Sequence, residues 1–278
     1  MKLAFVCDLP KEHFSYWNDG LRAALDYLVK KYNWQVSIFN LSSGQKTLDP
    51  DEYDFGLFWG AFGNKQHNRK YFKKQGLCFA GGPVSHPNLR NFDVVFTESS
   101  VDNEAIKQQG VLTVKAFGTN IKLFRPLPDQ KKVWDYIFPA AFALWKRHYV
   151  FAQTVEERKA LGLAVGYMQP NGWEKETYEY CLSHGITVLP WVPVDALVWL
   201  YNASKICLVT ADANGGSQRV ILEAKACGLD VEVISESPKL LELKDLTPEQ
   251  VRNDWSEVSY GESLYNAISA VVEGAIIV

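Results

Sequence analysis

The sequence predicts an α/β protein made of two doubly wound parallel sheets that face a cleft. Short apolar strand patterns alternate with amphipathic helical patterns along nearly all of the 278 residues. That length suits two domains of about 120–150 residues each. A charged segment with two prolines, at residues 125–132, interrupts the alternation, which then begins again. We therefore expect one domain on each side of this segment.

The expected first domain comprises residues 1–125. Its strands are expected at residues 3–7, 34–39, 55–59, 77–80 and 94–97, with a further extended run at 111–115. A helix is expected over 17–32, because Leu21, Leu25 and Leu28 recur at helical spacing. A second helix is expected over 98–109, before Gly110.

The expected second domain comprises residues 126–250, and the helical tail at 251–278 is expected to pack back on the first domain. Its strands are expected at 136–138, 164–168, 186–189 and 206–209, and its helices at 146–161, 174–184, 194–201 and from 216 onward. Ligands of such sheets bind beyond the carboxyl ends of the strands. We therefore expect a ligand in the cleft between the two domains.

The composition is that of an ordinary globular protein. Apolar residues make up 47% and charged residues 22%, and the net charge of −3 argues weakly against binding nucleic acid over the whole surface. The five cysteines form no CxxC pair, which favours reduced core cysteines over disulfides or a zinc site. The first apolar run is too short for a signal peptide, and no run approaches the roughly 20 residues of a membrane span. We expect a cytoplasmic protein.

The most informative segment is 215–228, which follows the apolar strand at 206–209 and a polar turn. Gly215 and Gly216 allow a ligand to approach the backbone closely, and free amides where a helix begins attract phosphate. Glu223, one to two turns along the helix, can accept hydrogen bonds from sugar hydroxyls. The segment therefore indicates a site for a phosphate and a sugar.

Four further segments contribute to the interpretation, because they occur in a definite order along the chain together with this one. They are the linker 117–126, the strand and loop 138–147, the loop 189–194 and the short run 200–203. Together they resemble the GT-B glycosyltransferases, specifically the large retaining family with a Glu-x7-Glu signature. The resemblance covers residues 111–243 well and the N-terminal half only in outline.

This resemblance implies two Rossmann-like domains and a defined reaction. The protein would move a sugar from a UDP- or GDP-linked donor to an unidentified acceptor, with retention of anomeric configuration. Lys146 matches the lysine that the family places against the donor diphosphate, and Trp191 and Val192 match the loop over the nucleobase. Enzymes of this fold generally need no metal, so we expect neither a metal nor a cofactor beyond the donor.

The chemistry gives the matched residues distinct roles. Lys146, Arg147 and the amides at the helix start would stabilise charge on the leaving phosphate, and Glu223 would hold the ribose hydroxyls. The donor-binding candidates are Gly215, Gly216, Ser217, Gln218, Arg219, Trp191 and Val192. Alternatively, Arg219 and Glu223, four residues apart, could form only a surface ion pair.

Two departures from the family pattern bear on catalysis. Counting back eight residues from Glu223, the first glutamate of the signature falls on Gly215. The arginine that usually precedes the lysine is replaced in the region of Ala141, so Arg147 or Arg219 would supply the missing charge. These departures leave open a protein that binds a nucleotide sugar without catalysis.

A second alternative concerns the acceptor. The segment 65–74 has five fixed positive charges and no acid, and Lys65, Arg69 and Lys73 would share one stripe of a helix. A hydroxylated DNA base is therefore a conceivable acceptor, although a solvated basic face explains the same pattern. His86 is a further candidate on the acceptor side. Asp49-Pro50-Asp51 superficially matches an Asp-x-Asp metal motif, but its setting predicts a turn.

Overall fold

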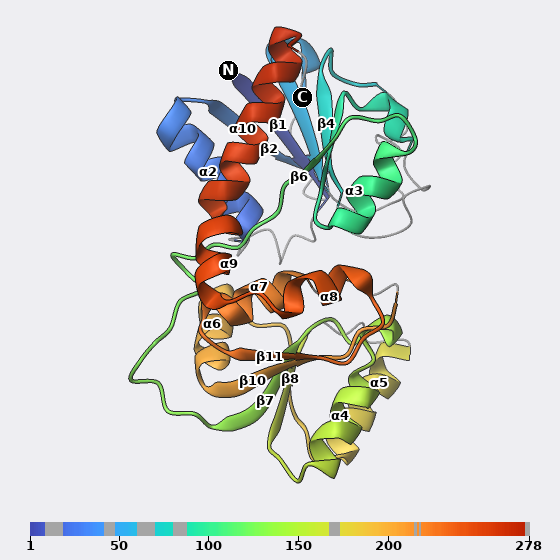
Figure 1. The fold of residues 1–278 in the computed structure, drawn as a ribbon, viewed down its shortest axis with the longest axis vertical. Helices are drawn as coiled ribbons and strands as arrows, with labels where there is room; N and C mark the ends of the chain where they lie inside the picture. Colours follow the sequence, from blue (N-terminus) through green and yellow to red (C-terminus); the bar gives the residue numbers. More distant parts are fainter. Residues whose placement is uncertain are drawn as a thin grey trace. The chain divides into compact units, whose positions relative to one another are not determined.

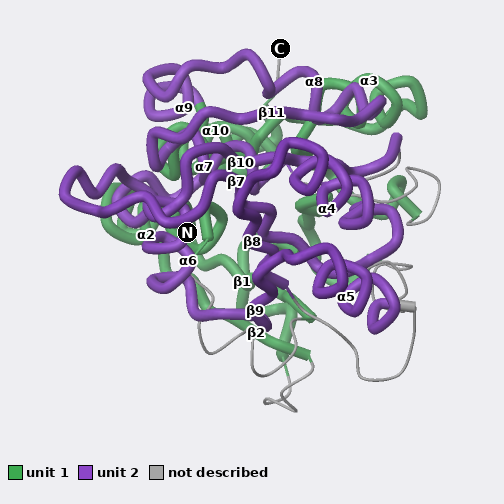
Figure 2. Tube along the Cα trace, turned by 90° about the horizontal axis from the view of Figure 1, so that it is seen from below, with its two compact units in different colours: residues 1–118, 255–278 green, residues 119–254 purple. Residues whose placement is uncertain are grey.

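In a computed structural model, the described residues of the protein fold into two compact units. They are residues 1–8, 19–41, 48–59, 70–79, 88–166, 173–213, 216 and 218–275. Unit 1 comprises 1–118 with 255–278, and unit 2 comprises 119–254 (Figure 2). Each unit is a parallel sheet with helices packed against it (Figure 1). The prediction of an α/β protein with two doubly wound parallel sheets is confirmed.

The described part of unit 1 contains a six-stranded parallel sheet in the order β2-β1-β3-β4-β5-β6. Its strands are β1 (Lys2–Cys7), β2 (Gln35–Asn40), β3 (Phe55–Trp59), β4 (Gln75–Phe79), β5 (Val94–Thr97) and β6 (Thr113–Lys115). Its helices are α2 (Gly20–Tyr32), α3 (Ser100–Lys107) and α10 (Glu257–Glu273), with 3-10 turns η2 (Pro50–Glu52) and η4 (Leu89–Asn91). Strands β3 and β5 span the residues that the sequence predicts.

The helix expected over 17–32 is observed from Gly20, and residues 17 and 18 lie outside the described part of the chain. Asp19 defines its beginning, because the Asp19 carboxylate accepts a hydrogen bond of 3.0 Å from the backbone N–H of Arg22. The helix ends where Asn33 adopts the left-handed conformation, at a φ of 54°. Local capping residues thus fix both ends.

Two apolar layers cover the sheet of unit 1. On one face, side chains of α2 and α10 pack on alternate residues of β1, β3 and β5. On the other face, the intervening strand residues pack with Ile106 of α3 and with Phe72 and Phe92 from loops. The helix formed by the last part of the chain therefore completes the core that the first part begins.

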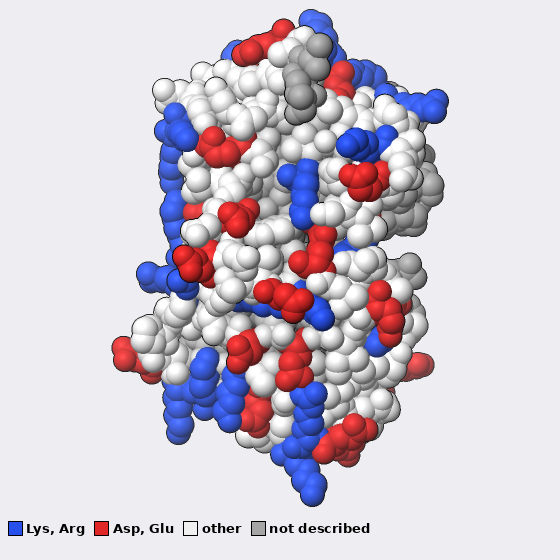
Figure 3. Space-filling view, viewed as in Figure 1, with Lys and Arg blue, Asp and Glu red and all other residues white. Residues whose placement is uncertain are grey.

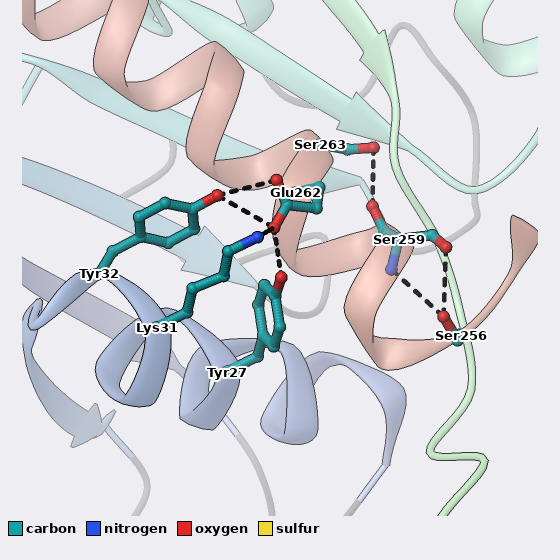
Figure 4. Close-up of polar contacts among 7 residues, drawn as sticks. All are labelled: Tyr27, Lys31, Tyr32, Ser256, Ser259, Glu262 and Ser263. Carbon is teal, nitrogen blue, oxygen red and sulfur yellow. Dashed lines mark hydrogen bonds and ion pairs between the residues drawn. The ribbon is translucent and has the colours of Figure 1, made fainter. Parts of the chain in front are cut away.

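A polar cluster joins α10 to α2 at the rim of this core (Figure 4). Glu262 of α10 accepts hydrogen bonds from the Lys31 ammonium at 2.8 Å, from the Tyr32 hydroxyl at 2.8 Å and from the Tyr27 hydroxyl. The hydrogen bonds from Lys31 and the two tyrosines hold the pKa of Glu262 below its ordinary value. Glu262 is therefore ionised at neutral pH.

We expect Gly261→Ala to weaken the packing of α10 on α2. A Cβ at position 261 would lie 2.5 Å from Cδ1 of Tyr27, so the ring or the helix must shift. Overpacking of this kind typically costs about 1–3 kcal/mol in the free energy of unfolding. The measurement is the midpoint of chemical denaturation. Ser263→Ala is the control, because the Ser263 hydroxyl bonds only to Ser259 of the same helix in the described structure. Equal midpoints would contradict the prediction.

Unit 2 contains a five-stranded parallel sheet in the order β11-β10-β7-β8-β9 among its described residues. Its strands are β7 (Trp134–Pro139), β8 (Gly162–Val165), β9 (Thr187–Leu189), β10 (Ser204–Val209) and β11 (Asp230–Val233). Its helices are α4 (His148–Glu157), α5 (Trp173–Ser183), α6 (Val194–Asn202), α7 (Gln218–Ala226), α8 (Pro238–Lys244) and α9 (Pro248–Asp254), with the 3-10 turn η5 (Leu144–Lys146).

The helix expected over 146–161 is shorter and begins later than the sequence predicts. Arg147 has a φ of 54°, which separates η5 from α4, so the helix starts at His148. It ends at Glu157, before Lys159 adopts a φ of 52°. Lys146 therefore lies in a 3-10 turn and not in the first turn of a helix. Left-handed backbone at two non-glycine residues is not visible in the hydrophobic pattern.

Candidate functional site

The strand order of unit 2 marks one position at the carboxyl edge of its sheet. From β7 the chain adds β8 and β9 on one side, and then returns to add β10 and β11 on the other side of β7. The order therefore reverses between β7 and β10. In open α/β sheets this reversal point is where ligands bind, beyond the carboxyl ends of the strands. The segments that leave it here are 140–147 and 210–217.

Three donors, each directed at backbone carbonyls, hold these two segments together. The N–H of Asp212 donates to the carbonyl of Trp145 at 2.8 Å. The buried Thr210 hydroxyl lies 3.1 Å from the carbonyl oxygen of Lys146 and 3.0 Å from that of Arg147. The Lys146 ammonium donates to the carbonyl of Gly216. The structure thus brings Lys146 next to Gly216, which lies 70 positions away in the sequence.

The ammonium of Lys146 lies close to the beginning of α7. Gly216 precedes Gln218, the first residue of that helix, and a Cβ at position 216 would be 3.9 Å from Nζ of Lys146. A lysine and the first amides of a helix both favour a bound anion. Gly215 and Ser217, two of the predicted donor-binding residues, lie outside the described residues.

The side chain of Arg147 points toward the segment after β11. Its Nη1 contacts Oε2 of Glu236 at 2.9 Å, and its Nη2 donates to the carbonyl of Ile234 at 3.4 Å. These contacts, together with the Thr210 hydroxyl, stabilise the left-handed backbone that places Lys146. In the described structure two of its five N–H donors contact Glu236 and Ile234, and its predicted contact with phosphate is not seen among the described residues.

The carboxylate of Glu223 is buried within unit 2. Only 4% of the residue is exposed. One oxygen accepts a hydrogen bond of 3.1 Å from the Tyr201 hydroxyl, and the other lies 3.3 Å from Nε of Arg219. The ion pair with Arg219 is therefore present, but it joins an exposed arginine to a buried carboxylate, so it is not the surface pair that the spacing alone suggests. Burial, and then the charge of Glu223, raise the pKa of Tyr201 far above its ordinary value.

His148, which the sequence did not single out, is the first residue of α4, two positions after Lys146. It is fully buried, and its ring lies between those of Phe138 and Phe142, with centroids 4.6 Å away on each side. Neither ring nitrogen has a hydrogen-bond partner among the described residues. Burial, with the nearby charge of Lys146, lowers the pKa of His148 to about 3. The histidine is therefore neutral, and no sequence pattern distinguishes it from an exposed one.

The predicted base-side residues lie at the same carboxyl edge, beyond β8. Trp191 and Val192 follow β9, which pairs with β8, and both are partly exposed. Gly166, the residue after β8, is in close contact with the segment after β7, because a Cβ there would lie 1.9 Å from the carbonyl oxygen of Ala140. This contact tolerates only glycine. Trp191 and Val192 are therefore separated from Lys146 by one strand.

Comparison with known proteins identifies the fold to which this geometry belongs. No family model matches the sequence, and no curated protein matches it. Solved structures do match. AviGT4, a glycosyltransferase involved in avilamycin A biosynthesis, is 16% identical, with 99% of this chain and 98% of AviGT4 covered and a TM-score of 0.66. HepE from Anabaena in complex with UDP is 15% identical, with 99% and 98% covered and a TM-score of 0.55. The chain has the GT-B fold.

A third match shows that the GT-B fold does not define a single reaction. The UDP-GlcNAc 2-epimerase from Neisseria meningitidis, bound to UDP-GlcNAc, is 12% identical, with 99% of each chain covered and a TM-score of 0.56. At these identities the likeness establishes the fold alone. What this chain does with its GT-B fold therefore depends on its own residues.

Of the residues predicted for the acceptor side, only one lies in the described part of the chain. Lys65, Arg69 and His86 lie outside it. Lys73 lies in a loop before β4, not in a helix, and its ammonium is 3.4 Å from the Asp51 carboxylate, with both side chains exposed. The helical stripe of basic residues is thus not formed at Lys73.

The Asp49-Pro50-Asp51 segment and the other described residues show neither a metal-binding cluster nor a membrane-spanning helix. Asp49-Pro50-Asp51 is a turn, as predicted, because the Asp49 carboxylate accepts a hydrogen bond from the N–H of Asp51 and begins η2. Within the described ranges, no cluster of three or more His, Cys, Asp or Glu side chains could hold a metal ion. No helix in those ranges has the length and apolarity to span a membrane.

Proposed function

We propose that this protein is a glycosyltransferase that uses a nucleoside diphosphate sugar, UDP- or GDP-linked, and that unit 2 binds this donor. The observation that supports it most directly is the contact of Lys146 with Gly216, at the reversal point of the sheet and beside the start of α7. The GT-B fold adds support, since HepE has been solved with UDP and with UDP-glucose.

The reaction places specific demands on this site. The bond between the anomeric carbon and the donor diphosphate breaks, and the leaving nucleoside diphosphate keeps the electron pair. The acceptor hydroxyl oxygen forms the new bond to the anomeric carbon, and its proton passes to the leaving diphosphate. The Lys146 ammonium and the first amides of α7 are fixed positive groups that stabilise the charge on the leaving group. We propose retention of the anomeric configuration, which rests on the sequence resemblance alone.

Glu223 is proposed to hold the ribose hydroxyls of the donor. Its oxygen bonded to Tyr201 is committed to a buried partner, whereas its oxygen near Arg219 faces an exposed side chain. A ribose hydroxyl would therefore take the place of Arg219. This exchange frees the Arg219 guanidinium to contact the diphosphate. Arg219 then supplies the positive charge that the residues near Ala141 lack.

A thermal-shift screen against nucleoside diphosphates and their sugars tests the donor proposal. We expect at least one UDP or GDP derivative to raise the melting temperature, because binding only to the folded state stabilises it. If none does, the proposal is wrong. The bound sugar nucleotide is then incubated without acceptor. Slow release of free sugar supports a transferase, interconversion of the bound sugar nucleotide supports an epimerase, and an unchanged ligand supports a protein that binds without catalysis.

A DNA base as acceptor is a secondary proposal that rests on the charges of segment 65–74. Two of these charges are paired with acids in the structure, Lys70 with Asp93 and Lys73 with Asp51. Lysine and arginine also alternate with acids on the face shown in Figure 3. Gel shifts at two salt concentrations test the proposal, because phosphate contacts weaken steeply with salt. Absence of binding at low salt would contradict it.

A further inference from the structure

The buried carboxylate of Glu223 receives a hydrogen bond from a buried tyrosine on another helix of unit 2. Tyr201 lies in the last turn of α6 and has no exposed surface, and its hydroxyl donates to Oε2 of Glu223 in α7 at 3.1 Å. A carboxylate removed from water needs such a donor, because a buried charge without one is unfavourable. The Tyr201 hydroxyl therefore ties one oxygen of Glu223 to the interior of unit 2.

Packing and hydrogen bonds hold Tyr201 itself in place. Its ring lies edge-on to that of Phe124, with the centroids 6.1 Å apart. The next residue, Asn202, joins the end of α6 to the segment before β7. Its side-chain NH2 donates to the carbonyl of Arg125 at 3.0 Å, and its side-chain oxygen accepts from the N–H of Leu127 at 2.7 Å. Because burial raises the pKa of Tyr201 well above its ordinary value, the hydroxyl keeps its proton and remains a donor.

The two oxygens of the Glu223 carboxylate have different surroundings. Oε2 accepts from the fully buried Tyr201, whereas Oε1 lies 3.3 Å from Nε of Arg219, whose side chain is 54% exposed. The two oxygens belong to one planar group, so a donor that fixes Oε2 also limits where Oε1 lies. Oε1 is thereby kept beside a side chain that reaches solvent, which is the side from which a ligand arrives.

We propose that Tyr201 is a positioning residue for ribose recognition. By holding Oε2 of Glu223, its hydroxyl directs Oε1 toward a ribose hydroxyl of the donor, so that the protein prefers ribonucleoside to deoxyribonucleoside diphosphates. This inference rests on the proposed function, in which Glu223 holds the ribose. A site built to bond a ligand hydroxyl discriminates against the analogue that lacks it. Without the fixed donor, the carboxylate turns toward Arg219 and this discrimination is lost.

Calorimetric titrations with UDP, 2′-deoxy-UDP and 3′-deoxy-UDP, or with the corresponding guanosine compounds, measure this preference. The ribose preference is the Kd of the weaker deoxy analogue divided by the Kd of the parent diphosphate. In the wild type it should be about tenfold, equivalent to about 1.4 kcal/mol. Tyr201→Phe keeps the ring against Phe124 but has no donor, so its preference should fall to about twofold or less, with the deoxy analogues bound nearly as in the wild type. A merely structural role would weaken the parent and its analogues equally.

A second variant tests the position of the carboxylate without altering Tyr201. Glu223→Asp keeps the charge but shortens the side chain, so it should also lose the ribose preference, and it keeps the inference testable if Tyr201→Phe does not fold. Tyr136→Phe is the matched control. Tyr136, in β7, is also buried, and its hydroxyl accepts a hydrogen bond of 2.6 Å from Arg158. Loss of this hydroxyl should leave the ribose preference unchanged.

The possible outcomes separate this inference from the proposed function. The inference is overturned if Tyr201→Phe or Glu223→Asp keeps the wild-type preference, or if Tyr201→Phe weakens all three ligands equally. It is also overturned if the wild type binds the parent and both deoxy analogues equally, although the donor site then stands. If the wild type binds neither UDP nor GDP, the proposed function itself fails, and the role of Tyr201 fails with it.

Discussion

Lys146→Ala is expected to reduce the affinity for a nucleoside diphosphate by about 10- to 100-fold, because a hydrogen bond to a charged group contributes about 1.5–3 kcal/mol. The ammonium lies at the start of α7, where the diphosphate is proposed to bind. Affinity for the uncharged nucleoside should change little. The measurement is calorimetric titration with UDP and uridine, or with GDP and guanosine.

Two further variants separate the charge of Lys146 from its contact with Gly216. Lys146→Gln keeps a donor for the Gly216 carbonyl but has no charge, so it should lose nearly as much diphosphate affinity as Lys146→Ala. Lys244→Ala removes an exposed lysine from the end of α8 and should have no effect. Full diphosphate affinity in Lys146→Gln would mean that the lysine only shapes the turn, and would remove it from the donor site.

His148 is expected to make unit 2 sensitive to acid. Its pKa is lowered from 6.5 to about 3 in the folded protein, so between these values the unfolded chain binds a proton that the folded chain does not. The contribution of a neutral His148 to stability is therefore complete above pH 6.5 and is lost progressively as the pH falls toward 3. Within this window each decrease of one pH unit lowers the free energy of unfolding by up to about 1.4 kcal/mol.

Denaturation midpoints between pH 7 and 5 measure this effect before most carboxylates titrate. His148→Phe keeps a ring between Phe138 and Phe142 but cannot bind a proton, so its midpoint should vary much less with pH than that of the wild type. His184→Gln, at a partly exposed histidine beyond α5, should keep the wild-type slope. The same slope in His148→Phe and wild type would contradict the buried, neutral state.

The local patterns of the sequence predicted most elements of the fold, but not β11 or α8. Periodicity of apolar residues placed β3 and β5 at the observed residues, and it placed β7 and β10 within two residues of their observed ends. It misplaced the beginning of α4, because the left-handed conformation of Arg147 depends on contacts with Thr210, Ile234 and Glu236, which come from other parts of unit 2.

From the residues alone, the candidate site was predicted as separate pieces, and only the family resemblance joined Lys146 to the start of the helix after Gly216. Glycines before a helix, and a lysine after a strand, each indicate phosphate from local chemistry alone. Whether they meet depends on strand order, since β7 and β10 are neighbours only because β8 and β9 extend the sheet to the other side. The burial of Glu223 by Tyr201, and that of His148 by Phe138 and Phe142, likewise depends on packing between elements far apart in the chain.

Apolar periodicity and backbone chemistry are local properties, so they were enough to predict two doubly wound α/β units and to single out residues 215–228 as the segment proposed to bind phosphate. Which residues surround that segment is a property of the folded structure. The fold brings the Lys146 ammonium to the Gly216 carbonyl and the backbone of Trp145 to that of Asp212. It also directs Arg147 toward Glu236 and buries Glu223. These contacts follow from the order of strands and the packing of helices, which no local pattern encodes.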